Sequence, residues 1–158
     1  MRKSHYRDYA TEAFRFLARE GSAAAYRDRI WNDALERQRR REAGRFDGTS
    51  APTEAAVARA EQALYDAHAS IADLEAAEWA LQTLEKMRGR HAVTAVKAVY
   101  MITPDHPLER GEIQARVAAA SIGIPASERS VYGWLALARD MFAERRGLRI
   151  SGSAENFV

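Results

Sequence analysis

Residues 112–147 read EIQARVAAASIGIPASERSVYGWLALARDMFAERRG, and this stretch decides the fold expected for the chain. A short apolar-patterned segment leads into a turn that contains Gly123 and Pro125, and a second helix starts at Ser127. Two helices joined by a glycine-containing turn are typical of a helix-turn-helix unit, whose second helix enters the major groove of DNA. The stretch therefore predicts DNA binding.

The second helix of this pair is expected to run from residue 127 to residue 146. Apolar residues recur along it at steps of four, three and four, so they share one face; they are Val131, Leu135, Ala138 and Phe142. The residues expected to contact DNA lie away from this face, mostly in the first turn, and are Ser127, Glu128, Arg129, Ser130, Tyr132 and Arg139.

Several of these side chains suit a definite role. The Ser127 hydroxyl suits the N-cap, because it can accept a hydrogen bond from a free backbone N–H of the first turn. Arg129 carries the planar fork of donors that reads guanine bidentately. Ser130 or Tyr132 is suited to hold a phosphate. A helical hairpin that only packs would give the same pattern, so a packing module is the alternative interpretation.

The spacing of the turn departs from the common pattern. There the turn glycine precedes the valine of the second helix by about six residues, whereas Gly123 precedes Val131 by eight. We therefore expect either a longer turn or an earlier end of the first helix.

The remainder of the chain also has helical patterns, so the expected fold class is all-α. An N-terminal hairpin, a linker rich in glycine and small residues, a long central helix and a C-terminal trihelical unit are expected in that order. The helices are expected at 6–19, 22–43, 53–88, 92–102, 110–120 and 127–146. The expected division is a scaffold or oligomerisation region over 1–88 with its linker at 44–52, a helix-turn-helix domain over 89–150 and a disordered tail over 151–158.

The long helix carries an apolar stripe with near-heptad spacing, made of Val57, Ala60, Leu64, Ala67, Ile71 and Leu74. Either the N-terminal helices fold back on this stripe, or a second copy of the chain pairs with it as a homodimer. Both arrangements predict that the stripe is buried. The acidic side chains Asp66, Asp73 and Glu75 are expected to face water.

Charge is distributed unevenly along the chain, whose formal net charge is +2. Residues 1–52 carry a balance of +4, residues 53–85 of −6 and residues 86–150 of +5. The part with the helix-turn-helix pattern is therefore basic and suits a polyanionic partner. The basic run 39–41 ends a helix, and we favour a solvated helix end over a phosphate-binding arm for it.

The order of elements resembles the phage-derived late-gene transcriptional regulators of the RinA/ArpU type, over roughly residues 45–148. The resemblance rests on SAPTEAA at 50–56, the long helix, Tyr100, SERSVYGWL at 127–135 and FAERRGL at 142–148. It implies a C-terminal module similar to the promoter-reading region of bacterial sigma factors. Such proteins typically carry a basic residue before the tryptophan, where this chain has Gly133. A glycine there removes a phosphate contact and costs the helix roughly 1 kcal/mol relative to alanine.

Composition argues against several other classes of protein. The chain has no cysteine, and its four histidines lack the spacing of metal ligands, so no metal or cofactor is expected. No run of 18 or more apolar residues and no signal peptide are found, so we expect a cytoplasmic protein without a membrane partner. No catalytic motif is present, and an enzyme is not expected.

The leading hypothesis is a sequence-specific transcriptional regulator that binds double-stranded DNA. The alternative is a helical protein-interaction adaptor, for example one that contacts RNA polymerase without binding DNA directly. A phage packaging subunit is a third option, disfavoured because such proteins usually place the DNA module before the oligomerising helices.

Overall fold

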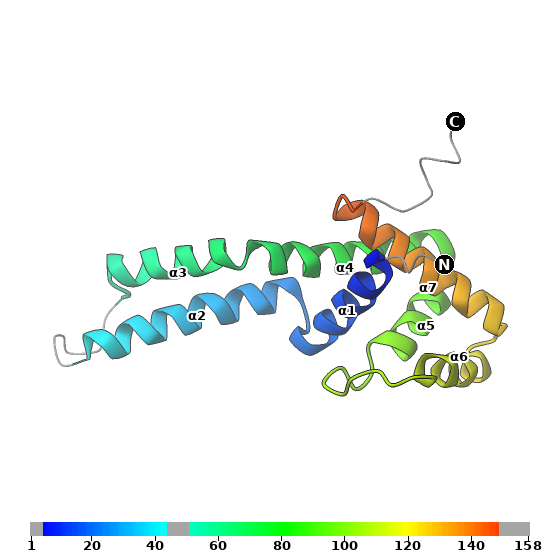
Figure 1. The fold of residues 1–158 in the computed structure, drawn as a ribbon. Helices are drawn as coiled ribbons and strands as arrows, with labels where there is room; N and C mark the ends of the chain where they lie inside the picture. The colour runs from blue at the N-terminus through cyan, green and yellow to red at the C-terminus, as the bar shows by residue number, and fades with distance from the viewer. Residues whose placement is uncertain (1–4, 44–50, 149–158) are drawn as a thin grey trace.

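Helices make up the regular structure of the residues that the computed structural model describes, 5–43 and 51–148 (Figure 1). No β-strand occurs within these two ranges, so the all-α prediction is confirmed. In chain order the helices are α1 (His5–Glu20), α2 (Ala23–Glu42), α3 (Glu54–Asp66), α4 (His68–Arg88), α5 (Arg90–Tyr100), α6 (Glu112–Gly123) and α7 (Glu128–Arg145).

Three hydroxyl side chains begin helices where the sequence predicts a helix start. Ser22, Thr53 and Ser127 each accept a hydrogen bond from the backbone N–H three residues later, at 2.9, 3.1 and 3.1 Å. Each bond satisfies one of the N–H groups that a helix leaves free in its first turn. The N-caps of α2, α3 and α7 are therefore encoded locally.

The single helix predicted over 53–88 is instead two helices, so that prediction is wrong at Ala67. This residue has φ −93° and ψ 7°, and its N–H is shared between carbonyls three and four residues earlier. The ring Nδ1 of His68 lies 2.7 Å from the Tyr65 carbonyl oxygen, a side-chain contact within the helical ladder. The helices α3 and α4 nevertheless stay nearly in line (Figure 1).

Together α2 and α3 form an arm that extends away from the rest of the molecule (Figure 1). The two helices lie side by side along their length, and Val57 and Leu64 of α3 are half-buried. On α4, Ile71 and Leu74 are buried, and this helix packs against α1 and α2. The N-terminal helices therefore fold back on the stripe, as one of the two predictions had it, and its burial requires no second copy.

The core lies where α1, α4, α5, α6 and α7 meet. Its largest fully buried side chains include Phe14, Leu74, Leu84, Tyr100 and Phe142. Burial of side chains of this size contributes roughly 1.5–3 kcal/mol each. The cluster draws on residues from both sides of the boundary expected at 88/89.

The helices α5, α6 and α7 pack against one another pairwise. The bounds of α5 and α6 differ from those predicted. A glycine with φ +84° at position 111 precedes α6, which then continues through Gly123 rather than ending at residue 120. The turn is therefore 124–127, which is an ordinary length for two crossing helices. Both explanations offered for the eight-residue spacing are wrong, because Gly123 is the last residue of the helix and not part of the turn.

The tail expected at 151–158 and most of the linker, 44–50, lie outside the described residues. Among the helices that are described, none combines the length and the apolar character needed to cross a bilayer.

Candidate nucleic-acid interface

The inner face of α7 anchors this helix to the core. The four residues of its predicted apolar stripe are all 0 % exposed, which confirms that prediction: Val131, Leu135, Ala138 and Phe142. The Phe142 ring also packs against Phe14 of α1, with centroids 6.2 Å apart. Because the inner face is fixed in this way, the outer face of the same helix has a defined position.

The first turn of α7 is held by its cap and faces outward. Ser127 Oγ accepts from Ser130 N at 3.1 Å and donates to Ser130 Oγ at 3.0 Å. Glu128 and Arg129 are exposed and take part in none of the ion pairs found among the described residues. Tyr132, one turn further, is 40 % exposed. Five of the six predicted site residues are thus exposed near the start of α7.

Arg139, the sixth predicted site residue, is engaged inside the protein. It is half-buried, and its Nη1 donates to the Tyr100 hydroxyl at 2.6 Å. Tyr100 is 1 % exposed and ends α5. The Arg139 guanidinium therefore links α7 to α5.

The C-terminal half of α7 is tied to the N-terminal half of the chain. Asp140 accepts a hydrogen bond from the Tyr6 hydroxyl at 3.1 Å. The Arg145 guanidinium lies over the Trp79 ring, 5.3 Å from its centroid. These contacts fix the C-terminal half of α7 against α1 and α4.

Asp73 does not face water, so that part of the prediction is wrong. Its carboxylate accepts from the Tyr9 hydroxyl at 2.6 and 2.8 Å and pairs with Arg146 Nε at 2.7 Å. Desolvation, followed by the hydrogen bond to Asp73, raises the pKa of Tyr9 above its ordinary value, and the Asp73 contact raises the pKa of Arg146. This cluster joins α1, α4 and α7, whereas Asp66 and Glu75 are exposed as predicted.

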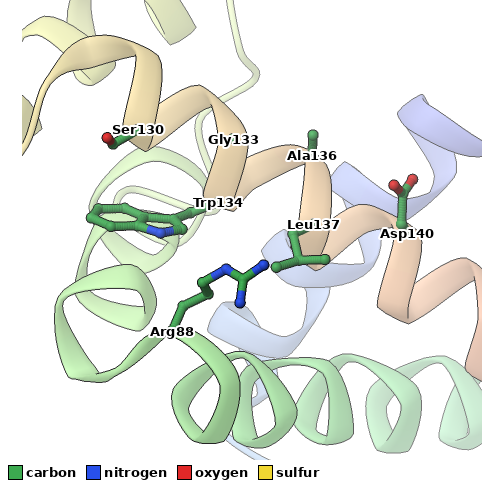
Figure 2. Close-up of a pocket in the computed structure, with 7 residues that line it drawn as sticks. All are labelled: Arg88, Ser130, Gly133, Trp134, Ala136, Leu137 and Asp140. Carbon is green, nitrogen blue, oxygen red and sulfur yellow. The ribbon is translucent and has the colours of Figure 1, made fainter.

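A hollow of about 440 Å³ lies beside the exposed turns of α7 (Figure 2). Ser130, Gly133 and Leu137 line it from α7, and the Trp134 ring lies flat along one side. The Arg88 side chain reaches into it from the C-terminal end of α4. Sequence reasoning missed Arg88, because nothing in the pattern of α4 indicates that its last turn adjoins α7.

Arg15 fixes the loop that leads into the helix pair. It is the one charged residue classed as buried in the described chain, at 2 % exposure. Its guanidinium donates to the carbonyls of Tyr100, Thr103 and Pro104 at 3.1, 3.3 and 3.3 Å, and also to that of His106. Desolvation lowers the pKa of Arg15, but guanidinium stays cationic near neutral pH.

Arg116 completes this arrangement from α6. Its Nη1 donates to the Val99 carbonyl at 2.8 Å, and its Nη2 donates to Thr103 Oγ1 at 2.9 Å and pairs with Glu112 at 3.2 Å. Thr103 has a left-handed φ of 43°. Two arginines from different helices therefore set the angle between α5 and α6, and with it the position of the turn before α7.

No group of metal-ligating side chains that could hold an ion occurs within residues 5–43 and 51–148. Comparison of the chain with protein-family models, curated proteins and solved structures gives no match.

Proposed function

We propose that this protein binds double-stranded DNA with sequence preference and regulates transcription. The proposal assigns α6 and α7 as a helix-turn-helix unit, with the N-terminal half of α7 in the major groove. The observation that carries it is the contrast between the two faces of α7. The inner stripe is fully buried, while the capped first turn presents Ser127, Glu128, Arg129 and Ser130 to solvent.

Within this proposal, Arg129 reads a guanine and Ser130 or Tyr132 holds a phosphate. Free backbone N–H groups at the start of α7 add donors for a second phosphate oxygen. Arg88 supplies the cation that Gly133 does not, because it lines the same hollow as Ser130 and Gly133. Arg139 is left out of the DNA-contacting set, since Tyr100 already holds its guanidinium.

The phage late-gene regulators that the sequence resembles supply the biological setting of the proposal. A protein-interaction adaptor, such as one contacting RNA polymerase, is the second candidate. Ile122 favours it, because this large apolar side chain is 87 % exposed in the last turn of α6. An exposed apolar residue at that place suits a protein partner better than a phosphate backbone.

The test replaces Arg129 with alanine and measures affinity for a duplex selected from a random pool by the wild-type protein. The expected loss is about 1–3 kcal/mol on the selected site, with relaxed preference at one base pair. Arg7→Ala is the matched control, because Arg7 is exposed on α1 and absent from the ion pairs of the described residues.

Equal effects of Arg129→Ala and Arg7→Ala would reject Arg129 as a base-reading residue. If the wild-type protein selects no duplex, the function is instead assigned to a protein partner. Replacement of Ile122 by serine would then be the informative variant, with RNA polymerase as the first binding partner to assay.

A further inference from the structure

The arm carries a second surface whose chemistry the helix-turn-helix proposal does not use. A hollow of about 210 Å³ lies between α2 and α3. Its lining comes from matching positions on the two helices: Arg37 and Arg41 lie one turn apart on α2, and Arg59 faces them from α3. Residues spaced by three and four along a helix share a face, so both helices present one complete face to the hollow.

Among the described residues, the three arginines of the hollow have no carboxylate partner. None of them occurs in the ion pairs or side-chain hydrogen bonds found among the described residues, and all three are exposed. Asp66, the one acidic residue in the lining, accepts instead from Gln62 at 2.9 Å. By contrast Arg39 and Arg40, in the same run on α2, both pair with Glu36.

Three guanidiniums line the hollow against the single carboxylate of Asp66, and this net positive charge attracts an anion. The guanidinium fork matches phosphate oxygens in geometry. The rest of the wall is small or polar, with two alanines as its only apolar residues. A peptide partner would need a pocket for a large apolar anchor, and none is present in this lining.

We propose that the hollow formed by Arg37, Arg41 and Arg59 binds a backbone phosphate of nucleic acid, independently of base sequence. This revises the interpretation of the basic run as only a solvated helix end: Arg39 and Arg40 fit that description, whereas Arg41 belongs to the phosphate site. The inference stands on the arm alone and does not require α7 to bind DNA.

The test measures binding of a random-sequence duplex to the full chain at about 50 and 200 mM salt. The double variant Arg37→Gln/Arg41→Gln is compared with Arg39→Gln/Arg40→Gln. Both double variants change residues of α2 and remove two charges, and glutamine keeps a polar side chain. Only the first variant changes residues that line the hollow. Arg59→Gln provides an independent variant on α3.

Because the hollow holds one phosphate, the first pair should flatten the slope of log affinity against log salt by up to about 0.9. The salt-dependent loss between the two concentrations should then shrink by up to roughly 3.5-fold, and Arg59→Gln should act in the same direction with a smaller slope change. Equal slopes for the two double variants would overturn the site and leave only diffuse charge.

The side-chain Nε–Hε signals of arginine in nitrogen-15 NMR identify the occupant directly. The random duplex should shift the signals assigned to Arg37, Arg41 and Arg59 while leaving those of Arg39 and Arg40 nearly in place. Inorganic phosphate at matched ionic strength is the second probe. Shifts with inorganic phosphate but none with the duplex would overturn the nucleic-acid assignment in favour of a small anion. Failure of Arg129→Ala to change sequence preference would leave this result unaffected.

Discussion

At the scale of single residues, Arg15 determines more of the architecture than its position in the sequence suggests. It lies among apolar residues in the segment AFRFLAR, where a helical pattern indicates only an interruption of the core face. The structure shows what a cation does there: from α1, Arg15 donates to the Tyr100 carbonyl at the end of α5 and to the Thr103 and Pro104 carbonyls of the following loop. That requirement depends on tertiary packing, so no local pattern predicts it.

Arg15→Leu should lower the free energy of unfolding by about 3 kcal/mol, because the buried Tyr100 carbonyl and the carbonyls of the following loop lose a charged donor. Urea unfolding followed by circular dichroism measures the change. Arg7→Leu on the exposed side of the same helix is the control and should stay within about 0.5 kcal/mol of wild type. A loss for Arg15→Leu no larger than that of the control would contradict the role given to the guanidinium.

Gly133→Ala should stabilise the protein by roughly 0.5–1 kcal/mol, since alanine favours the helix and the added methyl group meets no atom within 4 Å. Gly89→Ala should do the opposite, because Gly89 has φ +91° between α4 and α5, a conformation that alanine rarely adopts. Thermal unfolding of the two variants provides the comparison. Destabilisation by both would mean that Gly133 has a packing role that its open surroundings do not indicate.

At the scale of elements, features set by contacts within a few residues can be predicted from the sequence. Features set by contacts between helices cannot. The N-caps Ser22, Thr53 and Ser127 begin helices as expected, because each acts on the backbone three residues away. The break at Ala67 was missed, since alanine is the best helix former. It separates α3, which packs mainly on α2, from α4, which packs on α1, α2, α5 and α7.

The same distinction applies to the candidate site. The exposed start of α7 follows from helical periodicity alone, so Ser127, Glu128, Arg129, Ser130 and, one turn further, Tyr132 could be placed from the sequence. The partner of Arg139 and the position of Arg88 depend on how α5 and α4 approach α7, which periodicity does not specify.

The cluster of Tyr9, Asp73 and Arg146 predicts how stability changes at alkaline pH. Burial and the hydrogen bond to Asp73 raise the pKa of Tyr9 above 10.0, so the folded state favours the neutral phenol. The contribution of the neutral Tyr9 phenol to the free energy of unfolding is fully present below about pH 10. It is lost as pH rises through the raised pKa of Tyr9. Wild-type stability should therefore fall above about pH 10.

Tyr9→Phe should be less stable than wild type near neutral pH, and its stability should fall less steeply above about pH 10. Urea unfolding at about pH 8, 10 and 11 measures both differences. Tyr65→Phe is the control, because Tyr65 is 70 % exposed, and its curve should run parallel to wild type. Parallel curves for Tyr9→Phe and wild type would contradict the linkage.

At the scale of the whole molecule, the described residues form one core and one projecting arm (Figure 1). Because Ile71 and Leu74 are buried and α3 packs along α2 within one chain, we expect a monomer in the absence of DNA. Sedimentation velocity at concentrations from about 1 to 100 μM tests this, a range over which a standard-size specific interface would associate. A dimer throughout that range would require an interface on another surface.

The measurement that tests the central claim most directly is the affinity of the wild-type protein for a selected duplex and for random duplexes. We predict affinity for the selected site at least about 10³-fold tighter than for random sequence, and salt-sensitive binding to both. Equal affinity for all duplexes would contradict base reading by α7 and leave only backbone binding. Absence of salt-sensitive binding to any duplex would contradict the assignment of this protein as a DNA-binding protein.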